Sequence, residues 1–350
     1  MHARLSQTLV AMAALGVFSV SAAAQQAPAP APPQLTVSGV VYGQYLYQLK
    51  DSLGAGNQNQ FSIQRSYINV IGRFSGGLQT RVTVDIAPTG TGNQQVRLKY
   101  AYFGWTPTNS NLTYKLGLIH TPYIDWAEAL WDYRMQGPIA VDRNGYMTSA
   151  DFGAGIDGHW NSEQVNGQLA FVNGEGYSGG TGDNHKDLEA RISVRLSSTN
   201  DNSRVGGVRL TGYAGIGKPN SGGTRNRFLG TLSYKTQQIT LAAEYTATKD
   251  TVTGPTPAPV AKTNGSVISA FGVYKFKSSK AAVVARVDVV DPNTNTGNNK
   301  QTRVIGGLSY QLTPNLRLLG DVDLLSYEAG ATPLQDAAAK RALFQVQITF

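Results

Sequence analysis

The 350-residue sequence contains no cysteine. Disulfide frameworks, zinc sites with thiolate ligands and cysteine nucleophiles are therefore excluded, and the absence of thiols suits a chain exported to the periplasm. Long apolar runs are also missing, because no stretch after residue 24 approaches the roughly 20 apolar residues of a membrane-spanning helix. An exported chain without such a helix is either soluble or a membrane β-barrel.

The first residues have the order of a secretory signal peptide. Arg4 supplies a positive charge, Leu9–Val20 an apolar core and Ala22–Ala24 a cleavage site of small residues. An N-terminal membrane helix is the alternative, but the apolar core is too short for one. We predict a signal peptide over residues 1–24 and, from the proline and alanine content, an extended periplasmic linker over residues 25–34.

The chain then alternates between apolar and polar residues, segment after segment. In residues 78–86, for example, Leu78 and Val82 lie on one face and Arg81 and Asp85 on the other. This period of two indicates strands, and most segments have about ten residues, the length that a tilted strand needs to cross a bilayer. Sixteen strands are predicted, beginning near Leu35, Phe61, Leu78, Val96, Leu112, Ala150, Val165, Asp187, Val205, Arg225, Ile239, Val267, Ala281, Gln301, Leu316 and Ala342.

The connections between these segments alternate between short and long. Residues 75–77 and 313–315 are typical short ones, and residues 250–265 a typical long one. Soluble sandwiches have no reason to keep this order, whereas outer-membrane barrels do. The predicted fold is all-β, a transmembrane antiparallel up-and-down barrel of 16 strands over residues 35–350, closed because an open edge in lipid would leave backbone groups unpaired. Sixteen strands leave an aqueous lumen.

The third long connection, Ile119–Ser149, is the longest run that resembles neither a strand nor a tight turn. Asp125–Trp131 has helical spacing, and Trp126, Leu130 and Tyr133 are expected to share one face. We predict that this third extracellular loop folds into the lumen as the constriction of a pore. Its aromatic residues are expected to anchor it to the barrel wall, with sugar binding as the alternative.

Residues 63–74, 96–105 and 112–123 give the chain a likeness to a known family. Their sequences, IQRSYINVIGRF, VRLKYAYFGW and LTYKLGLIHTPY, together with DLEAR at residues 187–191, resemble those of bacterial outer-membrane porins. Within the general porin superfamily, the pattern is similar to the group of phosphate-selective porins O and P. The resemblance implies a sixteen-stranded barrel, a homotrimer, an inward-folded third loop, and anion selectivity that depends on lysines and arginines near the constriction.

The formal net charge is +8, and on the polar faces of the predicted strands basic residues outnumber acidic ones. A basic wall opposite an acidic loop would create a transverse field that favours anions. The alternative is a solvated wall of mutually paired charges. The predicted constriction residues are Arg65, Arg81, Arg97, Lys99, Lys115, Asp125, Glu128 and Arg134.

Other chemistry lacks support in the sequence. Gly153–Gly158 matches G-x-G-x-x-G, but no helix follows, as dinucleotide binding would require. The histidines have no metal spacing, no basic stretch with interleaved aromatics indicates nucleic acid, and the loop Asp291–Gly297 is expected to be a polar loop rather than a calcium site. We therefore expect no enzyme and no cofactor.

The predicted function is passive diffusion of small hydrophilic solutes through an outer-membrane porin, with a preference for anions, phosphate included. The expected partners are these solutes, outer-membrane lipid and two further copies of the chain. Two alternatives stay open: a solute-specific channel for a sugar or an organic anion, and a structural or receptor barrel with a closed lumen.

Overall fold

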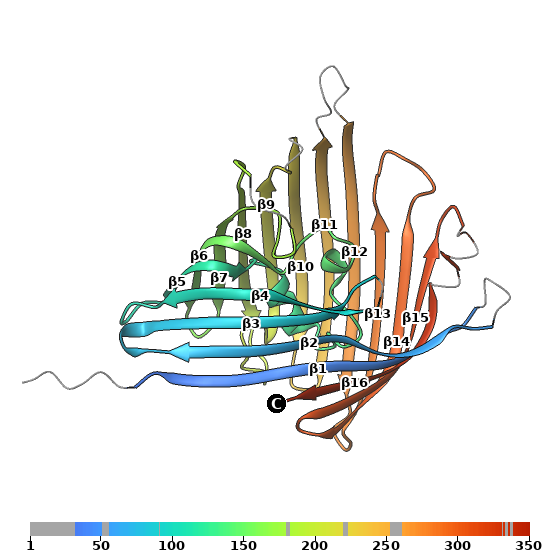
Figure 1. Ribbon diagram of the computed structural model, residues 1–350, viewed down its shortest axis with the longest axis horizontal. Helices are drawn as coiled ribbons and strands as arrows, with labels where there is room; N and C mark the ends of the chain where they lie inside the picture. The colour runs from blue at the N-terminus through green and yellow to red at the C-terminus, as the bar shows by residue number, and fades with distance from the viewer. Residues whose placement is uncertain are drawn as a thin grey trace, which may run out of the picture. The chain divides into compact units, whose positions relative to one another are not determined.

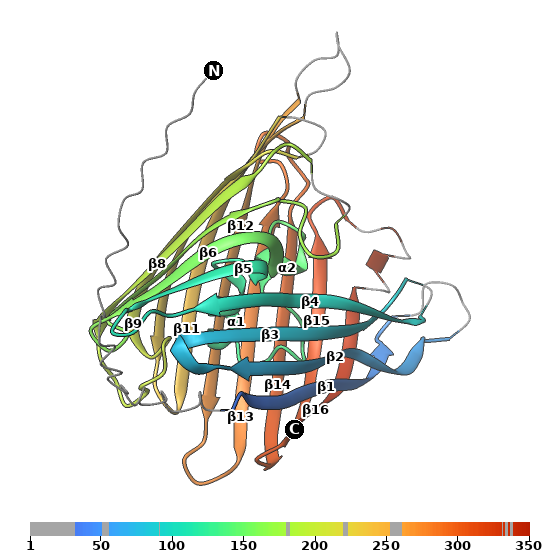
Figure 2. The same ribbon diagram turned by 60° about the vertical axis from the view of Figure 1, so that its left-hand side comes forward.

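Sixteen antiparallel strands form a closed barrel, in which each strand pairs with its neighbours in sequence and β16 pairs with β1 (Figures 1 and 2). The computed structural model describes residues 32–50, 56–90, 92–179, 183–219, 223–252, 261–330, 332, 335–336 and 339–350. The predicted signal peptide, and the predicted linker as far as residue 31, lie outside the described residues. The predicted barrel fold and its up-and-down order are confirmed.

The strands are β1 (Gln34–Gln48), β2 (Asn59–Arg73), β3 (Leu78–Pro88), β4 (Gln94–Trp105), β5 (Leu112–His120), β6 (Ala150–Trp160), β7 (Val165–Val172), β8 (Asp187–Ser197), β9 (Gly207–Gly217), β10 (Thr224–Lys235), β11 (Ile239–Val252), β12 (Ala261–Lys275), β13 (Ala281–Asp291), β14 (Gln301–Thr313), β15 (Leu316–Tyr327) and β16 (Lys340–Thr349). The helices are η1 (Ser75–Gly77), α1 (Ile124–Leu130) and α2 (Ala140–Arg143). No helix in the described part of the chain is long and apolar enough to cross a membrane.

The predicted strand starts lie within two residues of the observed ones, except in β12. This strand begins at Ala261 rather than near Val267. Its first residues, which include Lys262 and Asn264, lack apolar alternation, yet they continue the ladder with β11. Backbone pairing is independent of side-chain polarity, so a ladder that extends beyond the apolar band gives no periodic signal in the sequence.

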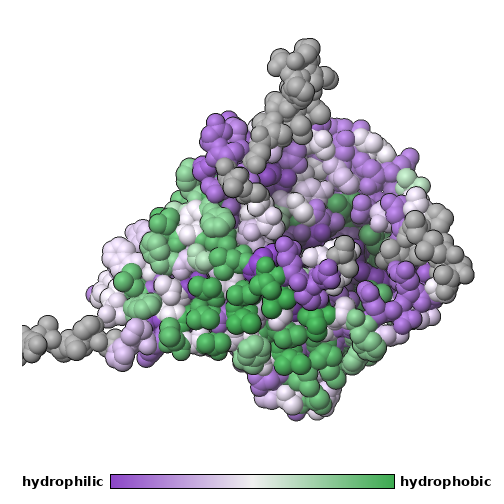
Figure 3. Space-filling view, viewed as in Figure 1, coloured by the Kyte–Doolittle hydropathy of each residue, from purple (hydrophilic) through white to green (hydrophobic). Residues whose placement is uncertain are grey.

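The two faces of the strands differ as the alternation predicts. In β11, Leu241 and Tyr245 are 51% and 55% exposed on the outer face of the barrel, whereas Thr240 and Thr246 on the inner face are buried. Figure 3 shows hydrophobic side chains gathered over the outer wall nearest the viewer and hydrophilic ones around the rim and in the hollow. The apolar faces therefore point outward.

A β-bulge interrupts the alternation in β4. Thr83 of β3 pairs with Tyr100 and the next residue, Val84, pairs with Leu98, so Lys99 is an extra residue in the ladder. Lys99 and Tyr100 are consecutive, but both are buried, at 4% and 5% exposure. A bulge re-aims side chains in this way. A second register shift of this kind, in β2, leaves Gln64 as the extra residue.

The outward faces of the strands should tolerate no charge. We expect Leu232→Arg, in which the replaced side chain is 55% exposed on the outer face of β10, to lower the free energy of unfolding from lipid vesicles by about 2–4 kcal/mol. Urea titration of the refolded barrel measures this change. Leu232→Phe serves as the apolar control and should stay close to the unchanged protein. Equal stability of the arginine and phenylalanine variants would contradict an outward, lipid-facing β10 face.

Candidate pore constriction

The segment between β5 and β6, residues 121–149, packs through apolar side chains against the inner faces of β9 to β15. Its Trp126, Trp131 and Tyr133 are at most 2% exposed. With their neighbours they form one buried cluster with strand residues, most of them from β9–β15 and two, Tyr42 and Tyr67, from β1 and β2. The members from β9–β15 are Tyr213, Leu229, Val267, Val273, Ala282, Val284, Val290 and Leu319. Each apolar inner-wall position in this set is covered by the segment. Tyr133 lies after α1, which ends at Leu130, so the predicted shared helical face is wrong in its last member.

Long polar side chains of the wall bind the irregular backbone of this segment. Hydrogen bonds to its carbonyl oxygens run from Arg191 to Pro122 (2.7 Å), Lys235 to Ala129 (2.8 Å), Arg317 to Asp132 (2.6 Å), Gln345 to Met135 (2.9 Å), Arg286 to Pro138 (2.9 Å) and Arg227 to Tyr146 (3.0 Å). These carbonyls lack a strand ladder and need other partners. Many basic residues of the inner wall therefore hold the segment in place.

Two hydroxyl groups of the segment also bond to the wall. The Tyr123 hydroxyl contacts the carboxylate of Glu244 in β11 and lies 2.7 Å from the Thr231 hydroxyl oxygen. The Tyr133 hydroxyl lies 2.6 Å from the hydroxyl oxygen of Ser309 in β14. The segment is thus fastened to β8–β16, and no comparable set of bonds is described between it and β1–β4.

The basic residues of β2 and β4 nearest the extracellular loops share one carboxylate. Arg65 and Arg97 lie 3.4 and 3.2 Å from the Oδ2 atom of Asp85. Tyr177, from the long connection after β7, donates its hydroxyl to the same oxygen at 3.1 Å, and its ring lies 5.2 Å from the Arg97 guanidinium carbon. The sequence analysis did not include Tyr177, because nothing in its local pattern places it beside β4.

Arg81 and Lys99 make only neutral contacts among the described residues. Arg81 donates to Asn69, at 3.0 Å, and to the Thr83 hydroxyl, at 3.1 Å, and its Nη1 lies 3.0 Å from Nε2 of His120. Because a guanidinium can only donate, His120 accepts through Nε2 and is neutral. Lys99 donates to the Tyr67 hydroxyl at 3.4 Å. These two cations therefore have no carboxylate partner.

Three of the four acidic residues in the segment are ion-paired. Asp125 pairs with Arg204 (2.6 Å), Glu128 with Arg134 (2.8 Å) and Asp132 with Arg317 (3.1 Å). Burial alone would raise the pKa of Asp125, but the ion pair with Arg204 brings this pKa below its usual range. Asp142 has no ion pair among the described residues.

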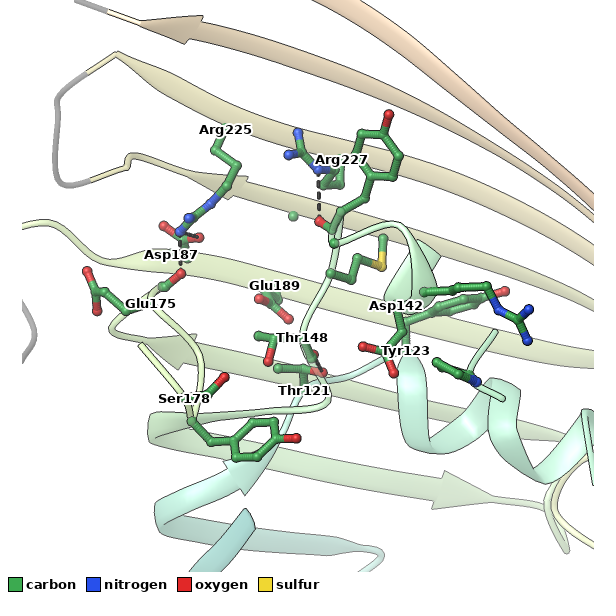
Figure 4. A pocket seen from close by; sticks show the side chains of 18 of the residues that line it. Thr121, Tyr123, Asp142, Thr148, Glu175, Ser178, Asp187, Glu189, Arg225 and Arg227 are labelled. Carbon is green, nitrogen blue, oxygen red and sulfur yellow. Dashed lines mark hydrogen bonds and ion pairs between the residues drawn. The ribbon is translucent and has the colours of Figure 1, made fainter. Parts of the chain in front are cut away.

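Two cavities flank Arg134. One, of about 470 Å³, is lined by Arg65, Arg97 and Asp142 among others. Arg225 and Asp187, which form an ion pair at 2.8 Å, also line it (Figure 4). The other, of about 350 Å³, is lined by Arg81, Lys99, Asp125 and Glu128 among others. Arg134 lines both cavities.

Seven of the eight predicted constriction residues line one or the other of these two cavities, and only Arg134 lines both. Lys115 lines neither of these two cavities; it pairs with Asp157 of β6. The geometry therefore does not support the predicted place of Lys115 in the constriction. Lys115 lies near the periplasmic end of β5, where the neighbouring strand β6 supplies the carboxylate of Asp157. In the described part of the chain, no group of three or more histidine, aspartate or glutamate side chains is placed to hold a metal ion.

Comparison with known proteins gives one family and many similar folds. The sequence model of the Gram-negative porin family matches residues 11–330. Among solved structures, the anion-selective porin of Comamonas acidovorans has a TM-score of 0.66 at 13% identity and covers 91% of this chain and 100% of its own. OmpT of Vibrio cholerae, folded in vitro and described as a trimer form, has a TM-score of 0.63 at 11% identity and covers 91% of this chain and 99% of its own.

OmpF of Salmonella typhi, in a complex with daunomycin, has a TM-score of 0.64 at 13% identity and covers 90% of this chain and 97% of its own. At such identities the likeness shows the fold. No sequence among curated proteins matches the chain.

Asp142 should make charge selectivity depend on pH. Burial raises its pKa above the ordinary value, although Arg134, Lys99 and Arg65 oppose the shift. As pH falls from neutral to about 4, Asp142 takes up a proton earlier than a free aspartate would, and the cavity of about 470 Å³ that it lines becomes more positive. We expect the reversal potential in a KCl gradient to shift toward greater anion preference, and Asp142→Asn to show this extra preference already at neutral pH. An identical pH profile in the variant would contradict this assignment.

Proposed function

This chain belongs to the Gram-negative porin family and is an outer-membrane channel for small solutes, and from this premise we propose that it conducts them passively through a wet lumen with a preference for anions. The gap between the segment 121–149 and the wall of β2–β4 is the proposed passage. The segment sets the bore, and the wall sets the preferred sign of charge.

The contacts of the segment support its role in narrowing the lumen. Residues of β8–β16 whose side chains face inward bind its carbonyls, and the segment covers the inner-wall apolar residues Val284 and Leu319. A segment fixed to one side of the lumen leaves the remaining width on the other side, against β2–β4. The cavity that contains Asp125, Glu128, Arg81 and Lys99 lies in that remaining width.

The observation that carries the anion preference is the balance of paired and unpaired charge across this gap. On the segment side, Asp125, Glu128 and Asp132 are each neutralised by an arginine. On the wall side, Arg81 and Lys99 have no carboxylate partner within the described residues. Unpaired charge in a narrow, partly desolvated passage acts on ions more strongly than paired charge does.

We also propose a homotrimer, in line with the solved OmpT structure that is described as a trimer form. Exposed apolar residues on β1–β4, such as Val37, Val70 and Val82, offer a face for such contacts or for lipid. Residues 1–24 are proposed as the export signal that brings the chain to the outer membrane.

Reversal potentials in planar bilayers test the anion preference. In a KCl gradient, the trimer should pass chloride more readily than potassium, and Arg81→Gln should reduce the permeability ratio about two- to fivefold, since one unpaired charge beside the ion path is lost. Arg303→Gln is the matched control, because Arg303 shares Asp323 with Arg143 and Arg341. Cation preference, or equal loss in both variants, would refute the proposal. A complete lack of conductance would favour a closed barrel.

Deletion tests the role of the segment. Removal of residues 125–132 should raise single-channel conductance, since this part of the segment lines the gap. A control deletion of residues 295–298, in the long connection between β13 and β14, removes residues whose described hydrogen bonds lie within that loop and should leave conductance unchanged. Conductance unaltered by the first deletion would place the segment outside the ion path.

A further inference from the structure

The β4 bulge places Lys99 and Tyr100 side by side on the inner face of the barrel, which regular alternation would not do. Since Lys99 is the extra residue of the ladder, it and Tyr100 both face inward. The strand keeps this irregularity in the centre of the described barrel wall, although a regular ladder would pair more backbone groups. Bulges occur preferentially beside functional sites, where they re-aim a side chain.

Lys99 is buried without an ion pair of its own, because the carboxylate that acts on it, Glu128, is paired with Arg134. The Lys99 side chain is 4% exposed, yet it lines the cavity of about 350 Å³. Removal of an ammonium group from water is unfavourable unless an opposite charge compensates for it. The rings of Tyr67 and Tyr100, whose centroids lie 4.6 and 5.4 Å from Nζ, offset part of this cost through cation–π attraction. They hold the ammonium in place but leave its charge intact.

Arg81 adds a second cation to the same ring. Its guanidinium carbon lies 4.6 Å from the Tyr100 centroid, so Tyr100 contacts both cations. Asn69, Thr83 and neutral His120 fix the guanidinium without neutralising it. Lys99, Arg81, Tyr67 and Tyr100 form what we name the Arg81–Lys99 subsite. It combines two unpaired cations with a rigid aromatic frame.

The rest of the cavity limits which anion would fit. Val40, Tyr42, Ala129 and Trp131 contribute apolar surface to its lining. The carboxylates of Asp125, Glu128 and Asp132 also line it. Asp125 and Glu128 pair with the other two cations of the lining, Arg204 and Arg134, so no free cation remains for a second negative charge on a solute. Because these carboxylates are already paired, they offer no free charge for the ammonium of a zwitterion.

We propose that the Arg81–Lys99 subsite binds small organic monocarboxylates during their passage, with the carboxylate at the two cations and an apolar body against the remaining lining. This inference rests on the proposed pore function and deepens it. Binding is transient and non-covalent. It makes the flux of such solutes saturable, whereas simple salts pass by diffusion.

Single-channel recording in KCl with added sodium benzoate tests the subsite. Benzoate should reduce the chloride current of the intact trimer with a saturating dose dependence. Lys99→Met keeps the length of the side chain and removes the charge; it should raise the half-blocking concentration about tenfold, as expected for the loss of one charged hydrogen bond. Arg81→Gln provides a second, independent variant. Lys275→Met, at an exposed position at the end of β12, is the charge-matched control and should block like the unchanged protein.

The outcomes separate the subsite from the pore function. Chloride preference without saturable block by benzoate would overturn the subsite and leave the pore intact. Equal block of the Lys99→Met and unchanged channels would also overturn it. Stronger block by phosphate than by benzoate would refute the preference for one charge, and stronger block by glycine would show recognition of zwitterions instead. Absence of chloride preference in the unchanged protein would count against the proposed function itself.

Discussion

Pairing of backbone groups is the constraint on which this structure depends. In hydrocarbon no water satisfies an open strand edge, and each unpaired group costs several kcal/mol. The ladder from β1 to β16 and back to β1 removes every such edge. Once the barrel is closed, alternation assigns one face of each strand to the outside and the other to the lumen, and the positions of the polar residues follow from that closure.

The inner wall is divided between two uses of basic side chains. On β8–β16, residues such as Arg191, Lys235 and Arg286 bond to carbonyls of the segment 121–149. On β3 and β4, Arg81 and Lys99 keep their charge unpaired toward the gap. A count of basic residues would treat these groups alike. Their partners show that the first set binds the segment, and we propose that the second set gives the passage its preferred sign of charge.

Much of the fold follows from the sequence, because period-two alternation and the order of short and long connections survive in a single chain. The sequence also holds a sign that the segment 121–149 packs on the wall. Ala282 and Val284 of β13 are apolar on the face that should line water, as expected where other side chains cover the wall. The β4 bulge cannot be predicted from the sequence, since one extra residue has the same effect on the alternation as the end of a strand. Contacts between distant elements, such as Tyr177 with Asp85 or Lys115 with Asp157, depend on register and remain hidden until the barrel is formed.

The central claim is that solutes pass between the segment and the wall of β2–β4. Since the chain has no cysteine, a single introduced thiol can report on access. The Asn69→Cys variant puts this thiol in the proposed passage. The Thr246→Cys variant puts it at a fully buried, inward-facing position of β11. An anionic thiosulfonate reagent added during recording should reduce the current through the Asn69 variant and leave the Thr246 variant unchanged. Rapid block at position 246 with no effect at position 69 would contradict the account.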